Sequence, residues 1–275
     1  MSDMTNPADF DLDAYLARIG LKQAPDADWG GMDFLQRQHR LTIPFENLDI
    51  ALGRGISLDP DHVFAKLVHH RRGGYCFEQN QLFLRALHAI GFDARPILAR
   101  VWLRTEGLPP RTHTANLVEI GGQTWLADAG FGGGYAPPMP LSDGAETPGP
   151  DGALFRMRLD AEHGWTLERL APGADRAGGW ERQYSFTTDR VFPADLEMSN
   201  HWTSTRPDTR FTSQTIVSLV LPSGFASLVD RRYVRHTAKE QVESEIESAK
   251  AYRLRLNFVF GLILDEVEVM GLGLY

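Results

Sequence analysis

The spacing of apolar residues changes twice along the chain, and each change predicts a different kind of structure. In the first ~90 residues apolar side chains recur at helical spacing, as in Leu12, Leu16 and Ile19. Pro44 limits the second such segment, because the residue before a proline is pushed out of the helical region. This part predicts a helical bundle, with helices near 12–19, 34–39, 60–69 and 76–90.

From Pro96 the apolar residues alternate as they do in strands. Gly121 and Gly122 separate two of these segments and predict a two-residue hairpin turn. The stretch 144–152 is rich in glycine and proline and predicts a loop. We expect an antiparallel sheet that curls into a small barrel. Its candidate strands are 97–103, 112–120, 124–129, 155–159, 165–170 and 183–187.

Past Pro193 the pattern is mixed. Ser244 and Glu247 have the spacing of a helix capping box, which predicts a last helix over 244–258. Leu254 and Phe258 would share one face of that helix. The other elements expected here are a helix at 194–201 and strands at 215–221, 225–229 and 262–264.

Composition narrows the classes of partner. A formal net charge of -8 argues against nucleic acid or an anionic membrane surface as the main partner. A single cysteine excludes an internal disulfide framework and a cysteine-based zinc cluster. No apolar run approaches the ~20 residues of a membrane helix, and residues 1–10 are polar and acidic, unlike a secretory signal. These features predict a soluble cytoplasmic protein.

The single cysteine, Cys76, lies in the stretch Arg72-Gly73-Gly74-Tyr75-Cys76-Phe77-Glu78-Gln79-Asn80. Two glycines precede it and a helical pattern follows, which predicts a strained entry and a place for Cys76 in the first helical turn. There the unpaired N–H groups and the helix dipole favour a thiolate and can donate to an oxyanion. The alternative is a small buried hydrophobic residue. The stretch alone does not decide between them.

The hairpin supplies a base and an acid for this cysteine. If Gly121 and Gly122 are the turn residues, Asp128 stands opposite Ala115, on the face that His113 shares. Asp128 then lies diagonal to His113, at a Cα separation of ~7–8 Å that a hydrogen bond between the side chains can span. A nucleophile needs a base and the base needs an orienting group. A purely structural histidine–acid pair is the alternative.

The run from Asp128 to Tyr135 has four glycines in five positions and could let backbone N–H groups approach a ligand. A flexible connector has the same composition. Phe131 in this run and Phe45 in the irregular segment 43–48 could line an aromatic-accepting pocket or belong to the core. His39, His88 and His201 lack partners at metal-ligand spacing, so no metal site is predicted.

These motifs, in this order, resemble those of the arylamine N-acetyltransferases. The cysteine stretch matches the RGGxCxExN pattern at every fixed position, whereas Ala129 stands where many members have valine. The region 144–182 and the last ~40 residues carry little motif support. The resembling segments are Ile43–Leu48, Arg72–Asn80, His113 with Asp128–Gly132, and Asn200–Thr212.

The resemblance implies an α+β fold with a papain-like cysteine-triad architecture. It divides the chain into an N-terminal helical bundle (1–92), a central antiparallel β-barrel (93–192) and a C-terminal α/β lid (193–275). It makes Cys76 the nucleophile, His113 the base and Asp128 the orienting acid. The acceptor pocket would be lined by Phe45, Phe131 and Phe211, and coenzyme A would contact Thr112, Gly132 and Gly133. Glu46 and Arg72 would form a supporting ion pair.

The implied reaction is a ping-pong transfer from acetyl-CoA, through an acetyl-cysteine, to an arylamine, arylhydrazine or related acceptor. Acetyl-CoA would be a co-substrate, with no permanently bound cofactor, and the protein a monomer or weak homodimer. The same triad also serves papain-like peptidases, transglutaminases and amide synthases. A non-enzymatic binding protein is the alternative from a different class.

Overall fold

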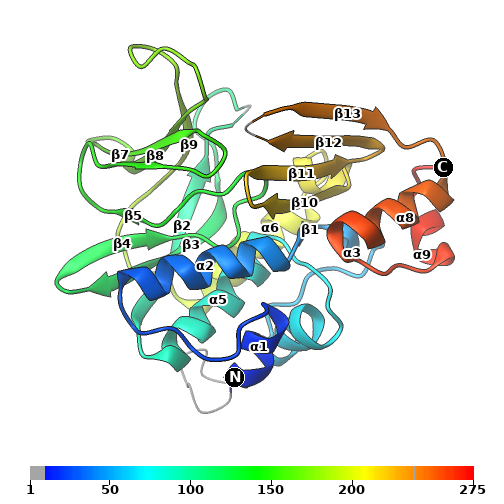
Figure 1. The fold of residues 1–275 in the computed structure, drawn as a ribbon, viewed down its shortest axis with the longest axis horizontal. Coiled ribbons are helices and arrows are strands. Elements are labelled where there is room, and N and C mark those ends of the chain that lie inside the picture. The colour runs from blue at the N-terminus through cyan, green and yellow to red at the C-terminus, as the bar shows by residue number, and fades with distance from the viewer. Residues whose placement is uncertain (1–9, 104, 238) are drawn as a thin grey trace.

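The computed structural model describes residues 10–103, 105–237 and 239–275. The prediction about a secretory signal falls on 1–10 and so lies almost wholly outside these residues. Figure 1 shows the helices of residues 12–42 and 76–90 on one side of the molecule, below two sheets that lie side by side. The helices of this part are α1 (Leu12–Arg18), α2 (Trp29–Thr42), α3 (Leu48–Ala51), α4 (Pro60–Phe64), the π-helix η2 (Ala65–His69) and α5 (Cys76–Ile90).

The predicted helical bundle is confirmed, and its helix ends have local causes. Asp11 and Asp28 cap α1 and α2 by accepting from backbone N–H groups of their first turns, at 2.9 and 2.8 Å. Helix α2 ends before Pro44, as expected. Gly91 ends α5 in the left-handed conformation, with φ 106°.

Within the described residues, the central region forms an eight-stranded antiparallel sheet that curls into a nearly closed barrel. The sheet order is β5-β4-β3-β2-β9-β8-β7-β6. Gly121 and Gly122 both have positive φ, the requirement of a type I′ turn, and Ile120 faces Gln123, as predicted. The strands are β2 (Asp93–Val101), β3 (Arg111–Ile120), β4 (Gln123–Ala127), β5 (Met139–Pro140), β6 (Glu146–Pro148), β7 (Leu154–Asp160), β8 (Gly164–Leu170) and β9 (Trp180–Phe186).

The prediction of a loop over 144–152 is wrong in part, because β6 lies within it and pairs with β7. Strand β6 is at the edge of the sheet, where a strand tolerates a proline such as Pro148. The glycines and proline that suggested a loop are therefore compatible with this short edge strand.

The second sheet has the order β1-β10-β11-β12-β13 in the described residues. The predicted helix at 194–201 and the first two predicted strands are confirmed, with shifted ends. Strands β12 and β13 and the helices α7 and α9 were not predicted. The elements are α6 (Pro193–Thr205), α7 (Arg210–Ser213), β10 (Ile216–Leu221), β11 (Gly224–Val229), β12 (Arg232–Thr237), β13 (Gln241–Glu245), α8 (Ala249–Phe260) and α9 (Glu266–Gly271).

The predicted last helix begins too early. Ser244 lies in β13, and Ser248 caps α8 instead by accepting from the N–H of Ala251 at 3.3 Å. Leu254 and Phe258 face solvent, Phe258 with 80% of its surface exposed. The buried face of α8 consists of Tyr252, Leu256 and Phe260.

The strand predicted at 262–264 is also wrong. This segment is irregular and links α8 to α9, with Leu262 and Leu264 buried in the core between the C-terminal sheet and its helices. Two buried leucines with one exposed residue between them imitate a strand pattern in so short a segment.

The strand β1 (Phe45–Glu46) joins the amino-terminal part of the chain to the C-terminal sheet. It pairs with β10 in the C-terminal sheet, with Phe45 opposite Ser218 and Glu46 opposite Val217. A second, single bridge joins Phe45 to Gly74, just before the cysteine. Residues 45 and 46 of the irregular segment 43–48 thus form an edge strand of the second sheet, beside the cysteine motif.

Candidate active site

Cys76 is the first residue of α5, as predicted, and follows an extended Tyr75 (φ -95°, ψ -170°). Its side chain is buried, and its Sγ lies 3.7 Å from the carbonyl oxygen of Thr112 on β3. Gly73 and Gly74 precede it, but neither has a positive φ. The expectation that these glycines permit a strained backbone is therefore wrong.

These glycines are required by close approach. A Cβ atom on Gly73 would overlap the carbonyl oxygen of Pro44 and lie 2.7 Å from Cγ of Glu46. A Cβ atom on Gly74 would lie 2.8 Å from Oε2 of Glu78. The absence of side chains here lets the turn before Cys76 pack directly on β1 and on the first turn of α5.

Burial raises the pKa of the Cys76 thiol, and the carboxylate of Asp128 raises it further. The backbone N–H groups of Cys76 and Phe77 lower it, as a helix amino terminus should. The terminus thus acts in the predicted direction, but burial outweighs it. The thiol needs a proton acceptor close by to become a nucleophile.

His113 and Asp128 meet as the hairpin register predicted. Nε2 of His113 lies 2.7 Å from Oδ2 of Asp128, and both side chains are buried. His113 is on β3, and Asp128 directly follows β4, just beyond the last ladder pair between Asn116 and Ala127. The neighbours of His113 in sequence, Thr112 and Thr114, both approach the sulfur of Cys76.

Asp128 is saturated with donors. Its Oδ1 accepts from Nδ2 of Asn80 at 3.0 Å and from the N–H groups of Gly130 and Phe131 at 2.9 and 3.0 Å. Its Oδ2 also accepts from the hydroxyl of Tyr184 at 2.9 Å. Burial opposes the charge, but the imidazole and these donors outweigh it and lower the pKa of Asp128 to about 2. The carboxyl group is therefore ionised at neutral pH.

The loop after Asp128 packs tightly on the cysteine. A Cβ atom on Gly130 would overlap Nδ2 of Asn80 and lie 2.9 Å from Cα and O of Cys76. The buried Arg40 of α2 holds the loop from the other side and donates to the carbonyl of Phe131 at 2.6 Å. The glycine-rich run is therefore a fixed part of the site and not a free connector.

The three phenylalanines predicted for the pocket gather around the cysteine and histidine. Phe45 lies in the same buried cluster as Cys76, and its ring centroid is 6.0 Å from that of Phe211. The ring of Phe131 stands edge-on to His113 at 5.1 Å. Of the residues predicted to contact coenzyme A, Gly132 packs on the ring of Phe45, and Gly133 donates its N–H to Oγ of Ser218.

Comparison with known proteins agrees with this geometry. A family model described as N-acetyltransferase matches residues 31–269. The arylamine N-acetyltransferase of Escherichia coli is 38% identical over 216 residues, which cover 78% of this chain and 74% of that protein. The chain belongs to the arylamine N-acetyltransferase family. The resemblance inferred from the motifs is confirmed.

Solved structures of the family share the fold. The arylamine N-acetyltransferase from Salmonella typhimurium superposes with a TM-score of 0.88 and 30% identity, covering 96% of this chain and 98% of that one. The enzyme of Mycobacterium marinum in complex with CoA gives a TM-score of 0.86 at 27% identity, with 95% and 98% covered. The predicted α+β architecture is therefore that of the family.

Several residues of the site escaped prediction. Asn80 stands one helical turn after Cys76, a spacing that could have indicated a shared face. Tyr184 comes from β9, and Gln36, whose Oε1 accepts from the N–H of Asp128 at 2.8 Å, comes from α2. No local pattern distinguishes these two, or Arg40, from core and surface residues.

The described residues hold neither a cluster of metal ligands nor a helix that could span a membrane. Within 10–103, 105–237 and 239–275, no three His, Cys, Asp or Glu side chains converge closely enough to hold a metal ion. Over the same ranges, no helix combines the length and the apolar character that crossing a membrane requires.

Proposed function

We propose that this family member transfers the acetyl group of acetyl-CoA to the nitrogen of an arylamine, arylhydrazine or related acceptor, through an acetyl-cysteine at Cys76. The observation that carries the proposal is the 2.7 Å contact between His113 and Asp128 beside a cysteine at a helix amino terminus. A nucleophile, a base and an orienting acid are thereby joined in one buried site.

In the first half-reaction Asp128 holds Nε2–H of His113, which leaves Nδ1 as the ring nitrogen that takes the proton of Cys76. The sulfur attacks the thioester carbonyl, and the N–H groups at the start of α5 stabilise the oxyanion. The oxyanion then collapses, the carbon–sulfur bond to coenzyme A breaks, and the imidazolium returns its proton to the departing thiolate. The product is acetyl-Cys76 and free coenzyme A.

In the second half-reaction the amine nitrogen attacks the acetyl carbon of acetyl-Cys76. His113 takes the proton that this nitrogen loses, and the Cys76 thiolate leaves. Returning the proton to sulfur restores the resting enzyme. Asp128 stays ionised throughout, which agrees with its low pKa.

The finer assignments belong to the same proposal. Phe45, Phe131 and Phe211 would contact the acceptor ring, and Thr112, Gly132 and Gly133 would contact coenzyme A, which binds as a co-substrate. The division into 1–92, 93–192 and 193–275 is supported by a barrel core that lies wholly within 93–192, whereas the core of the helices also takes in Val118 and that of the C-terminal sheet takes in Leu48.

Intact-mass spectrometry tests the proposal. Mixing the protein with acetyl-CoA should add one acetyl group, and Cys76→Ala should take up none. Adding an aniline to the acetylated protein should remove the group and yield the acetanilide. An unmodified wild-type protein, or an acetyl group retained by Cys76→Ala, would contradict the ping-pong mechanism.

A further inference from the structure

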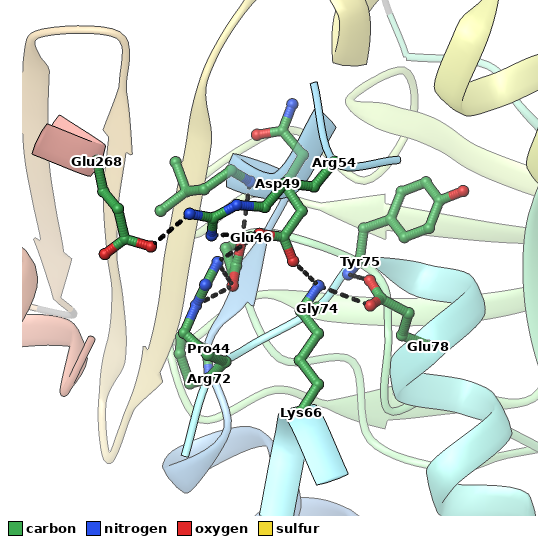
Figure 2. A network of polar contacts seen from close by, with 12 residues as sticks. Pro44, Glu46, Asp49, Arg54, Lys66, Arg72, Gly74, Tyr75, Glu78 and Glu268 are labelled. Carbon is green, nitrogen blue, oxygen red and sulfur yellow. Dashed lines mark hydrogen bonds and ion pairs between the residues drawn. The ribbon is translucent and has the colours of Figure 1, made fainter. Parts of the chain in front are cut away.

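Charged side chains from several elements meet beneath the turn that enters α5 (Figure 2). We call this set the charged network. Glu78 and Glu46 are almost fully buried, and Lys66 is nearly so. The charged network consists of Glu46 on β1, Asp49 on α3, Lys66 on η2, Arg72 in the segment between η2 and α5, and Glu78 on α5.

Lys66 is the centre of the charged network. Its Nζ lies 2.7 Å from Oδ2 of Asp49 and 2.7 Å from Oε1 of Glu78, and Figure 2 shows it between the two carboxylates. Arg72 continues the chain of ion pairs, at 3.2 Å from Asp49 and 2.8 Å from Glu46. The Glu46–Arg72 pair expected from the sequence is therefore present, as one end of a longer chain.

Glu78 links this network to the peptide that bears the cysteine. One carboxylate oxygen contacts Lys66, and the other accepts from the N–H of Tyr75 at 3.0 Å. Gly74 has no side chain to obstruct this approach. The carboxylate thus fixes the peptide just before Cys76, and that peptide sets the direction of the first N–H groups of α5.

We propose that Glu78 and Lys66 are positioning residues for Cys76, which aim the N–H groups at the start of α5 toward its sulfur and the substrate oxygen. The role rests on the proposed function, in which Cys76 is the nucleophile. Stability alone does not explain the pair, because replacing a buried ion pair by apolar residues of similar volume is often neutral or stabilising. An apolar pair would have no oxygen for the N–H of Tyr75.

Burial, together with the neighbouring charges, sets the pH at which Glu78 loses its proton. Lys66 faces it from η2, Glu46 from β1 and Asp49 from α3, with Arg72 beyond them. Burial raises the pKa of Glu78 to about 7, although Lys66 opposes the rise. A protonated Glu78 keeps its acceptor for Tyr75 but loses the charge that holds it to Lys66. Glu78→Gln imitates that state at every pH.

The test compares Glu78→Gln, Glu78→Ala and Lys66→Met with the wild type. Two rates are measured at pH 8, below the unfolding temperature of each variant: alkylation of Cys76 by iodoacetamide and its acetylation by acetyl-CoA. Because Glu78→Ala loses the acceptor and Lys66→Met leaves a carboxyl unpaired, both rates should fall about tenfold. Glu78→Gln should fall only about threefold, since its amide oxygen still accepts from Tyr75.

Further measurements distinguish a change in the position of Cys76 from a general loss of folded protein. The KM of the aniline for preformed acetyl-enzyme should not change in any variant. Between pH 6 and pH 8, acetylation by the wild type should rise more than acetylation by Glu78→Gln. The double variant Lys66→Met/Glu78→Gln should recover toward the Glu78→Gln rate, because it leaves no charge unpaired.

Glu268→Gln is the matched control. Glu268 lies on α9 and pairs at 2.7 Å with Arg54, at the solvent-facing end of this set of ion pairs, so its rates should match the wild type. Wild-type rates in Glu78→Ala and Lys66→Met, with or without a lower unfolding temperature, would overturn the inference. Alkylation needs no acetyl-CoA, so a failure of the proposed acetyl transfer would be seen separately.

Discussion

The pKa values of two buried carboxyl groups near the cysteine, Asp128 and Glu78, are shifted in opposite directions. Burial disfavours the charge of both. The pKa of Asp128 nevertheless falls to about 2, whereas that of Glu78 rises to about 7. Their different surroundings therefore decide which of them is a fixed anion.

The difference lies in donors and in neighbouring charge. Asp128 accepts from an imidazole, a hydroxyl, an amide and two backbone N–H groups. Glu78 accepts from Lys66 and from one backbone N–H group, and Glu46 lies close enough to raise its pKa. A dense set of donors makes a permanent charge, whereas one cation shared with another carboxylate leaves a group that titrates near neutrality.

The largest effect is expected from removing the charge of Asp128. Asp128→Asn should lower kcat/KM about 10³–10⁴-fold, because His113 loses the anion that fixes its tautomer and stabilises its charged form. Steady-state acetylation of an aniline, with circular dichroism to check the fold, measures the loss. An effect within tenfold of the wild type would mean that the dense donor shell has no catalytic consequence.

The next prediction concerns the packing that holds the donors in place. Gly130→Ala should lower kcat about 10²-fold, because the new methyl group displaces Asn80 and the backbone of Cys76. It should also lower the free energy of unfolding by about 1–3 kcal/mol. Gly178→Ala, at a site with open space around the added Cβ and no positive φ, should change neither quantity. Equal behaviour of the two variants would contradict this account of the loop.

A smaller effect is expected from removing a single donor to Asp128. Tyr184→Phe should lower kcat about tenfold, the value of one hydrogen bond to a charged group, while the imidazole contact remains. Tyr252→Phe, in the separate C-terminal cluster, should leave kcat unchanged and serves as the control. An unchanged kcat in Tyr184→Phe would contradict this prediction and would show that the remaining donors to Asp128 are enough for catalysis.

The last prediction tests the raised pKa of Glu78 by its effect on the stability of the protein. A carboxyl whose folded pKa is raised to about 7 from 4.5 keeps its proton in the folded state while the unfolded state loses it. Its contribution to stability is therefore complete below pH 4.5 and is lost as the pH rises toward 7. The slope reaches about 1.4 kcal/mol per pH unit.

Urea unfolding from pH 5 to pH 8 measures that slope. The stability of Glu78→Gln relative to the wild type should increase over this range, because glutamine carries no proton to lose. Asp128 contributes in the opposite direction, and only as the pH falls from about 4 to 2. A constant difference between wild type and Glu78→Gln would place the pKa of Glu78 near its ordinary value.

Much of the site was predictable because its geometry is local. A two-glycine turn fixes which residues face each other, so the meeting of His113 and Asp128 follows from residues within one hairpin. The start of α5 at Cys76 follows in the same way from the pattern after it. Tyr184 and Lys66 reach the site only through the tertiary fold, and no periodicity identifies them.

The C-terminal region was harder to predict for a physical reason. Every residue of β13 is exposed, so the strand has no buried apolar face, and Arg232 on β12 forms a diagonal ion pair with Glu243 on β13. The capping-box spacing at Ser244 then looked like a helix start, although the hairpin of β12 and β13 occupies that segment. Strands that are exposed on both faces leave little signal in the pattern of hydrophobicity.

The pairing of β1 with β10 has a consequence for how the chain folds. Asn47, directly after β1, accepts from the N–H of Ile216, 169 residues later in the chain. Closing so large a loop is slow compared with forming the helices and hairpins. During synthesis, strand β1, which carries Phe45, therefore stays without its partner β10 until most of the polypeptide has left the ribosome. We expect nascent chains that end before residue 216 to expose this segment to chaperones and proteases, even after the barrel has formed.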